Sequence, residues 1–241
     1  MFVHFVDGKS KNLMKFRRIG CLFCAVWFLC LCSCGLETFY FLDPPISDVE
    51  LENPSDPAQR VFSFQSVSNS ASSDIFVGTA VYYRLYNSQS TMNSNMATIE
   101  NINDEYSDAA MNRMISFGFQ PIALGNSELI VEKSEGVAKV KIRIFTEGTY
   151  KAEVLIDDDG KGVPLRFPLR KGFSFYPVEE ETEEEFPVPK EGDEDTNYSS
   201  AGGEIWYILA YAVSVGRSME LTPVYSQVTP LGWLSVSPDN Y

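Results

Sequence analysis

Residues 205–218 read Ile205-Trp206-Tyr207-Ile208-Leu209-Ala210-Tyr211-Ala212-Val213-Ser214-Val215-Gly216-Arg217-Ser218. Aromatic and aliphatic residues alternate along it, and it ends in a small turn that contains Gly216 and Ser218. Runs rich in aromatic and β-branched residues that end in turn residues are typical of β-strands. We therefore expect a long strand over residues 205–218.

Other segments share this composition and predict a mainly β fold. Residues 61–67 and 137–145 alternate apolar with polar side chains, as half-buried strands do. Further strand candidates are residues 75–86, 150–156, 165–169, 173–176, 221–225 and 233–236. Short strands separated by turn signals favour a β-sandwich.

Two segments resemble strands of fibronectin type III domains, which are immunoglobulin-like sandwiches. Residues 205–218 resemble the F strand and the F–G turn of that family, and Val81-Tyr82-Tyr83-Arg84-Leu85-Tyr86 resembles its C strand. The resemblance implies that both segments belong to one sandwich. The chain between them is far longer than in an ordinary module, so the remaining residues must form insertions or extra strands.

The first of two expected insertions covers residues 87–118. It is rich in Asn, Ser and Met, and Ser107-Asp108 can cap a helix over residues 109–115. A weaker turn or helix is expected over residues 95–105. We interpret this segment as a short helical insertion, either a lid over one end of the sandwich or a binding edge.

The second expected insertion, residues 177–203, is strongly acidic. It contains Glu179-Glu180-Glu181-Thr182-Glu183-Glu184-Glu185 and, further on, Asp193-Glu194-Asp195. Because like charges at this density repel each other, we expect a long, solvated acidic loop. It would capture divalent cations or a basic partner, or would be a disordered connection, which is the interpretation that we favour.

Residues 1–33 are typical of an export signal. A basic segment that begins at Lys15 precedes an apolar run over residues 19–32. This run is shorter than the roughly 20 residues that a membrane-spanning helix needs. Met14 is a more usual beginning for such a signal than Met1.

The end of this signal resembles the lipobox of bacterial lipoproteins, in the looser form found in spirochaetes. The motif reads Leu31-Cys32-Ser33-Cys34. The resemblance implies cleavage before Cys34 and attachment of fatty acyl chains, such as palmitate, which would anchor the protein to a membrane. Gly35 rather than Asp follows Cys34, which favours the outer membrane, with the folded part outside the cytoplasm.

Residues 34–59 are predicted to be a lipidated tether, and residues 60–241 to be the sandwich domain. The tether contains several prolines and scattered acidic residues, with little periodicity. It includes one aromatic cluster, Phe39-Tyr40-Phe41-Leu42. This cluster either docks on the domain or lies at the membrane interface, where aromatic side chains are favoured.

The composition excludes several functional classes. The net charge is −14, and such a surface repels phosphates, so we expect no nucleic-acid partner. The single histidine is His4, and all five cysteines lie at or before Cys34. The exported chain therefore lacks the residues for a Ser-His-Asp triad, a Cys nucleophile or a usual zinc site. We expect no catalytic residues and no cofactor.

One short motif leaves a metal site open. Asp157-Asp158-Asp159-Gly160 offers oxygen ligands like those of calcium loops, but the downstream acid of such loops is missing. Asp-Gly between two strand candidates is also a hairpin turn signal, and a turn is the interpretation that we favour.

Together these features predict an exported, lipid-anchored protein of the cell envelope that acts as a binding or structural module. Its partner would be an envelope protein or a glycan. Two alternatives stay open. One is a carbohydrate-active or metal-dependent hydrolase on a β scaffold, which would need two carboxylates facing a cleft. The other is a subunit of a larger envelope complex, with the aromatic strands forming an interface.

Overall fold

The computed structural model describes residues 40–47, 56, 59–124, 127–144, 152–157, 162–166 and 189–236. The chain divides into two compact units, Met1–Phe39 and Tyr40–Tyr241, and all described residues belong to the second. Within these residues strands dominate and form two sheets, and there are two α-helices. The prediction of a mainly β sandwich with a short helical insertion is therefore confirmed.

The first sheet joins strands from distant parts of the chain. Its order is β1 (Ile46–Ser47), β2 (Phe62–Gln65), β7 (Lys139–Arg143), β8 (Glu153–Ile156), β9 (Val163–Arg166) and β5 (Ala123–Leu124). All of these neighbouring pairs are antiparallel. β2, β7, β8 and β9 fall within or beside predicted strands, whereas β1 and β5 are too short to leave a signal in the sequence.

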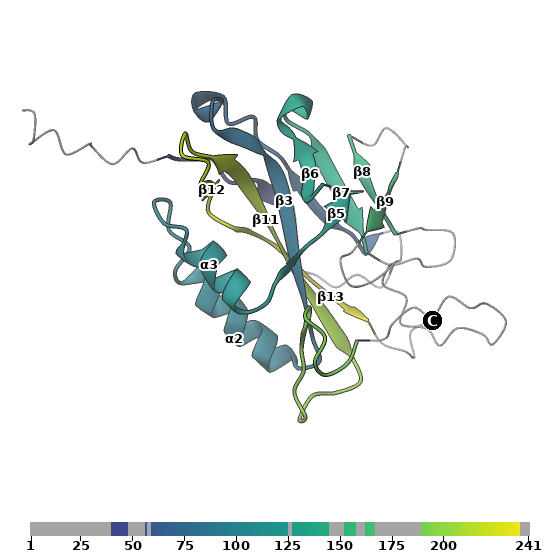
Figure 1. Ribbon diagram of the computed structural model, residues 1–241. Coiled ribbons are helices and arrows are strands. Elements are labelled where there is room, and N and C mark those ends of the chain that lie inside the picture. The colour runs from purple at the N-terminus through teal and green to yellow at the C-terminus, as the bar shows by residue number, and fades with distance from the viewer. Residues whose placement is uncertain are drawn as a thin grey trace, which may run out of the picture. The chain divides into compact units, whose positions relative to one another are not determined.

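The second sheet is built around two long strands, β3 (Phe76–Tyr86) and β11 (Trp206–Arg217) (Figure 1). They pair antiparallel along nearly their whole length, from Tyr86 opposite Tyr207 to Phe76 opposite Gly216. The other edge of β11 pairs with β12 (Pro223–Tyr225) and β13 (Thr229–Val236). The other edge of β3 is shared by β6 (Leu129–Glu132), β4 (Gln120–Pro121) and, in parallel, β10 (Thr196–Asn197).

Alternation along β3 sends its side chains to both faces of this sheet. Val81, Tyr83 and Leu85 face the first sheet and belong to one core with Phe62 and Phe64 of β2. All five side chains are at most 1% exposed. Because burial of one large apolar side chain contributes about 1.5–3 kcal/mol, this layer between the sheets holds the sandwich together.

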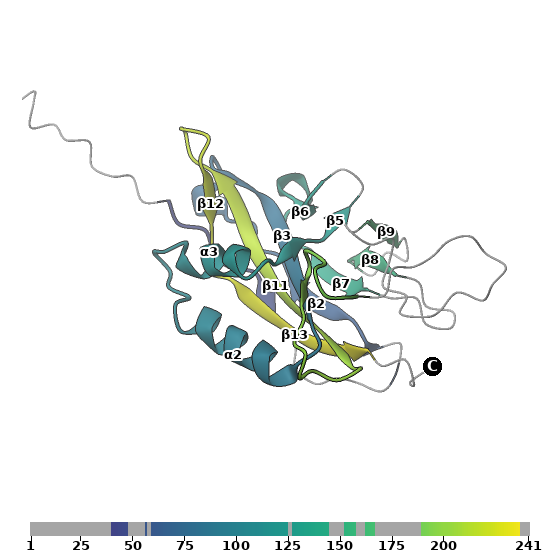
Figure 2. The same cartoon turned by 60° about the horizontal axis from the view of Figure 1, so that its bottom comes forward.

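Two helices, α2 (Gln89–Glu100) and α3 (Ala109–Ser116), cover the opposite face of the second sheet (Figure 2). The buried helical side chains Met92, Ile99, Met111 and Met114 share a core with alternate residues of the two long strands, namely Ala80, Tyr82, Tyr86, Leu209, Tyr211 and Val213. The insertion is therefore a third layer over a sheet face. It is not a lid over one end of the sandwich, because both faces of the long strands are apolar.

The helix expected over residues 95–105 begins earlier and ends earlier, at the bounds of α2. Ser88 precedes it as the N-cap, and its hydroxyl accepts a hydrogen bond from the Thr91 N–H at 3.4 Å. The first turns of α2 are rich in Ser, Thr and Asn, which compete for backbone hydrogen bonds and weaken the helical signal.

The segments that resemble the C and F strands are β3 and β11, and they lie side by side in one sheet. β13 lies next to β11 on the other edge. This order agrees with the C–F–G side of an immunoglobulin-type sandwich. The helical layer and the short strands on the second edge of β3 lie outside the two segments that carry the resemblance.

Two segments that the sequence places outside the packed sandwich contribute to it within the described residues. Residues 40–47, expected in the tether, pack on the domain and contribute β1. Residues 189–203, expected in a solvated acidic loop, contribute β10 and the buried side chain of Asp195. The strand candidate at 173–176 and the acidic run at 179–185 lie outside the described residues.

Candidate functional site

Cys34, the one site residue that the sequence predicts, lies outside the described residues, as does the whole of residues 1–33. The described chain begins at Tyr40. The geometry that bears most directly on the predicted anchor is therefore that of residues 40–47, which we call the entry segment.

Hydrogen bonds hold the backbone of the entry segment on the domain. Asn69 accepts a hydrogen bond from the Asp43 N–H, and its Nδ2 donates to the Asp43 carbonyl at 3.2 Å. The Ser214 hydroxyl donates to the same carbonyl at 2.7 Å. The Thr229 hydroxyl donates to the Pro45 carbonyl at 2.6 Å. The segment is thereby fixed to β11 and β13 of the second sheet.

Apolar packing reinforces these hydrogen bonds. Leu42 is 1% exposed and forms a small core cluster with Ile75 and Phe76. Tyr40 of the entry segment and Val224 of β12 are partly buried and pack against this cluster. For Leu42 the structure therefore shows docking on the domain, which is one of the two alternatives that the sequence left open for the aromatic cluster.

Asn69 is the residue of this contact that sequence reasoning missed. Its side chain is buried and its backbone is in the left-handed conformation, with φ of 47°. Asn adopts this conformation more readily than most residues. It lies in a run of Ser and Asn that reads as an ordinary turn, so its preference for positive φ is the one signal that could have found it.

The connection between β11 and β12 is a compact turn over residues 218–222, which we call the hairpin tip. The Ser218 N–H donates to the Thr222 carbonyl at 2.9 Å, and the two hydroxyls lie 2.6 Å apart. The Ser218 hydroxyl also accepts from the Glu220 and Thr222 N–H groups, each at 3.2 Å. These bonds define one conformation for the turn.

Two large apolar side chains project from the hairpin tip. Met219 is 88% exposed and Leu221 is 75% exposed. The backbone of Leu221 has a φ of 64°, in the left-handed region. The strand expected from residue 221 therefore starts only at Pro223, because Leu221 belongs to the turn.

The entry segment and the hairpin tip lie at the same end of the domain. Gly216, near the end of β11, lets the chain approach closely, since an added Cβ would lie 2.8 Å from the Ile75 carbonyl and 3.1 Å from Leu42 Cδ1. Val224, just after the tip, packs on the Leu42 cluster. In both ribbon views the purple start of the described chain lies beside β12 (Figures 1 and 2).

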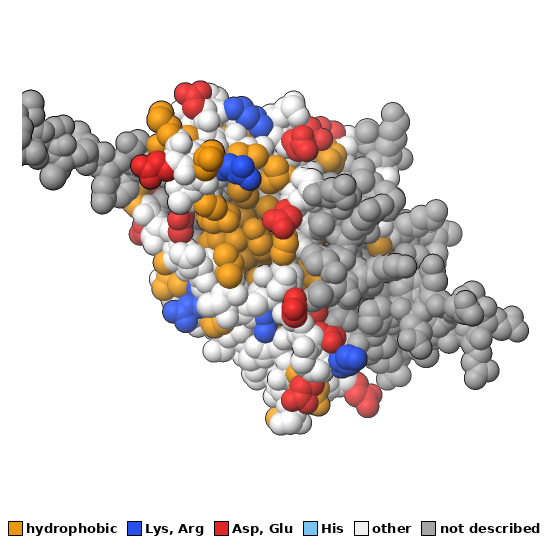
Figure 3. All heavy atoms as spheres, in the orientation of Figure 1, with side chains coloured by type: hydrophobic (Ala, Val, Ile, Leu, Met, Phe, Trp, Pro, Cys, Tyr) orange, Lys and Arg blue, Asp and Glu red, His pale blue; other side chains and the backbone are white. Residues whose placement is uncertain are grey.

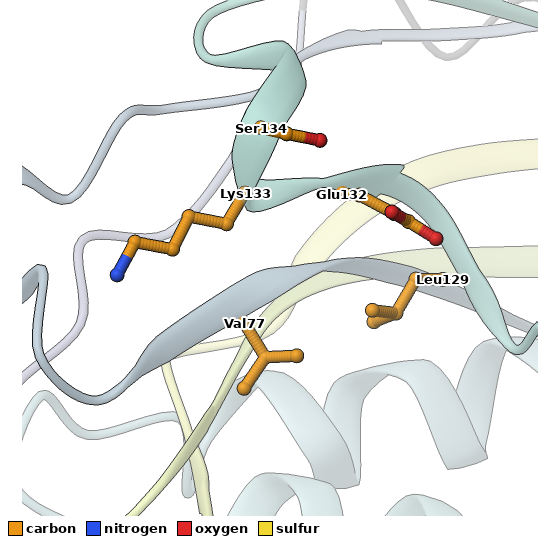
Figure 4. Close-up of a pocket in the computed structure, with 5 residues that line it drawn as sticks. All are labelled: Val77, Leu129, Glu132, Lys133 and Ser134. Atoms are coloured by element: carbon orange, nitrogen blue, oxygen red, sulfur yellow. The ribbon is translucent and has the colours of Figure 1, made fainter.

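A groove of about 650 Å³ opens where β3 and β6 pair, and its size is in the range of small-ligand sites. Its lining residues are Val77 on β3, Leu129 and Glu132 on β6, and Lys133 and Ser134 in the turn that follows (Figure 4). Lys133 Nζ donates to the Ser73 carbonyl, so this cation already has a partner. A hydrophobic area bordered by charged side chains covers the middle of one face of the domain (Figure 3).

Burial shifts the pKa values of two tyrosines and one acid in the described residues. Burial raises the pKa of the Tyr82 hydroxyl well above its usual value, and the nearby Tyr225 and Glu128 add to the shift. Burial also raises the pKa of Tyr225 and of the Asp108 carboxyl, although a backbone hydrogen bond from Tyr225 opposes the shift of Asp108. Both tyrosine hydroxyls therefore stay protonated at neutral pH and can serve as hydrogen-bond donors.

Asp195 contradicts the expectation that the acidic groups are solvated. It is 0% exposed, and its Oδ2 accepts a hydrogen bond from the Tyr83 hydroxyl at 2.9 Å. Its carbonyl accepts from the Leu85 N–H at 2.9 Å. The adjacent Thr196 carbonyl accepts from the Arg84 guanidinium at 3.0 Å. This part of the acidic segment thus closes the second edge of β3 and is structural.

Asp157 supports the turn interpretation of the Asp-rich motif. Its carboxyl accepts a hydrogen bond from the Lys139 N–H at 2.8 Å, and its own N–H donates to the Lys139 carbonyl at 2.8 Å. Residues 158–160 lie outside the described part of the chain. Among the residues that are described, no group of three His, Cys, Asp or Glu side chains is placed to hold a metal ion.

No helix within the described ranges is long and apolar enough to cross a membrane. Comparison of the chain with protein-family models, with curated proteins and with solved structures gives no match.

Proposed function

We propose that the protein is an exported lipoprotein of the bacterial cell envelope, held at a membrane by a lipid on Cys34. The observation that carries this proposal is the closeness of two features in the chain. A segment with the pattern of a lipoprotein signal ends at Cys34, and the entry segment, which packs on the domain, starts only six residues later at Tyr40. The lipid-bearing residue would thus lie immediately before a folded domain, where an anchor is useful.

The entry segment supports this proposal because it is firmly attached to the domain, so a lipid on Cys34 would keep the domain close to the membrane. Leu42 is buried, and the Asp43 backbone is bonded through Asn69 and Ser214. A segment that served only as a loose spacer would not need these contacts. Two or three acyl chains give stable attachment to a bilayer, whereas one chain gives reversible attachment.

The anchored domain would act as a binding module, with an envelope protein or a glycan as its partner. The groove beside Leu129 supports this role, because it combines apolar walls with hydrogen-bonding side chains. We favour the outer membrane as the location, with the domain outside the cytoplasm. The hydrolase alternative would need a pair of carboxylates at a cleft. Among the described residues, Asp195 is the one buried carboxylate, and it accepts a hydrogen bond from the Tyr83 hydroxyl.

The experiment compares the wild type with Cys34→Ser after expression in a bacterium that processes lipoproteins. Membranes are separated from soluble protein, and the membrane fraction is then partitioned with detergent. The proposal predicts wild type in the detergent phase and Cys34→Ser in the aqueous phase. Equal partitioning of the two proteins would refute the lipid anchor, because the Oγ of serine does not accept the lipid that the Sγ of cysteine does.

A further inference from the structure

The hairpin tip exposes two large apolar side chains to solvent, which is energetically unfavourable. Met219 and Leu221 are the two most exposed large apolar side chains of the described residues. Isolated exposed apolar residues are common and need no explanation. Here, however, two of them flank Glu220 on a turn that is fixed by the hydrogen bonds of Ser218. The tip therefore presents both side chains in a defined arrangement.

The backbone conformation of Leu221 is also unfavourable for a leucine. Leu221 has a φ of 64°, a conformation that Gly or Asn would adopt with less strain. A leucine that is both exposed and left-handed improves neither the core nor the turn. Strained residues persist where function requires them, so Leu221 indicates that the tip binds something apolar.

The hairpin tip lies near Tyr40, and this position indicates that its apolar environment is a membrane. Val224, three residues after Leu221, packs on the cluster of Leu42 and Tyr40, which opens the described chain. Five residues, 35–39, separate Tyr40 from Cys34. Even fully extended, this connection spans only about 20 Å. A lipid on Cys34 would therefore keep the end of the domain that bears the tip close to the bilayer surface.

We infer that the hairpin tip inserts Met219 and Leu221 into the interfacial region of the membrane that holds the Cys34 lipid. This inference rests on the proposed function. Two side chains alone would bind a bilayer weakly, but the anchor makes their insertion intramolecular and raises their effective concentration. The tip then fixes the orientation of the domain, with the opposite end of β11 directed away from the membrane.

The charge of the protein sets the kind of membrane contact. The net charge of −14 opposes attraction to anionic lipid head groups. Arg217 at the base of the tip is an exposed cation, and Glu220 within the tip is an exposed anion. The contact is therefore apolar and should form on vesicles of neutral phosphatidylcholine, with little dependence on salt.

The experiment places one fluorescent label at each of three positions in the full, lipidated chain. Because the proposed mature chain has no cysteine other than the lipid-blocked Cys34, Met219→Cys, Leu221→Cys and Tyr198→Cys each provide a single thiol. Tyr198 is the matched control, since it is an exposed aromatic residue close to the start of β11, at the opposite end of that strand. Each protein is reconstituted in phosphatidylcholine vesicles with and without doxyl-labelled quencher lipids.

The inference predicts a blue shift and loss of emission for the labels at 219 and 221, and neither effect for the label at 198. Absence of quenching at 219 and 221, in protein whose N-terminal peptide carries acyl chains, would overturn the inference and leave the proposed function standing. Quenching at all three positions would also overturn it, because this would be general adsorption. An N-terminal peptide without acyl chains would overturn the proposed function and the inference with it.

Discussion

Replacing Asn69 by Ala should release the entry segment from the domain. The buried Asn69 side chain makes two hydrogen bonds with the backbone of Asp43, and its Nδ2 also lies 3.4 Å from the Ser214 hydroxyl. Each such bond contributes about 0.5–1.5 kcal/mol, and the Asp43 N–H would be left without its acceptor. Alanine would in addition have to adopt a φ near 47°.

These contributions give a magnitude for the change in the free energy of unfolding. Loss of the side-chain hydrogen bonds should cost about 2 kcal/mol, and it affects Ala and Gly variants alike. The left-handed conformation should cost Ala roughly 1–2 kcal/mol more than Gly. We therefore expect Asn69→Gly to lose about 2 kcal/mol and Asn69→Ala about 3–4 kcal/mol.

The assay is urea unfolding followed by the fluorescence of Trp206 and Trp233, which both lie in the second sheet. Limited proteolysis at 40–47 provides a second readout, because a released entry segment becomes accessible to protease. Equal stability of the wild type and Asn69→Ala would refute the structural role of Asn69. Equal losses for the Ala and Gly variants would refute the contribution of the left-handed backbone.

Three further predictions concern other parts of the domain. Leu221→Gly should raise the free energy of unfolding by about 1 kcal/mol in urea unfolding, because glycine relieves the strain of a positive φ; a loss of stability would argue against that strain. Asp195→Ala should cost about 1–3 kcal/mol, and a double-mutant cycle with Tyr83→Phe should show coupling; additive losses would contradict the hydrogen bond between them. Burial raises the pKa of Tyr86 to about 12, whereas the unfolded phenol ionises near its usual value of 10, so thermal stability should fall as the pH rises from 10 to 12. Tyr86→Phe should make the decrease in melting temperature between pH 10 and 12 smaller. An unchanged decrease would contradict a raised pKa at Tyr86.

The long strands could be predicted from the sequence because their composition is unambiguous. β3 and β11 combine aromatic and β-branched residues over more than ten positions, and turn residues follow both. The capping pair Ser107-Asp108 also located α3, whereas α2 begins six residues before its expected start. It could not show that both faces of β3 are covered, since that depends on where the helices and the first sheet pack.

The contacts of the entry segment could not be predicted, because they depend on tertiary structure. Pro44 and Pro45 favour an extended spacer, and only the approach of Asn69 and Thr229 makes this stretch part of the domain. Asp195 is a similar case, since its partner Tyr83 lies 112 residues away in the sequence. Charge density favours a solvated loop, and a hydrogen bond over that separation leaves no local signal.

The conformation of the hairpin tip could not be predicted from the sequence for a different reason. The sequence predicts a strand at Leu221 because leucine and Val224-Tyr225 are compatible with one, and nothing local predicts a positive φ at a leucine. Strain of this kind is found where the local sequence and the observed structure disagree, and such places are expected to be functional.

Lipidation of Cys34 is tested by the intact mass of the N-terminal peptide from membrane-extracted protein, measured beside Cys34→Ser. We expect a wild-type peptide that begins at Cys34 and is heavier by two or three acyl chains, and no such peptide from the variant. A wild-type peptide without acyl chains, or one that retains residues 1–33, would contradict the account.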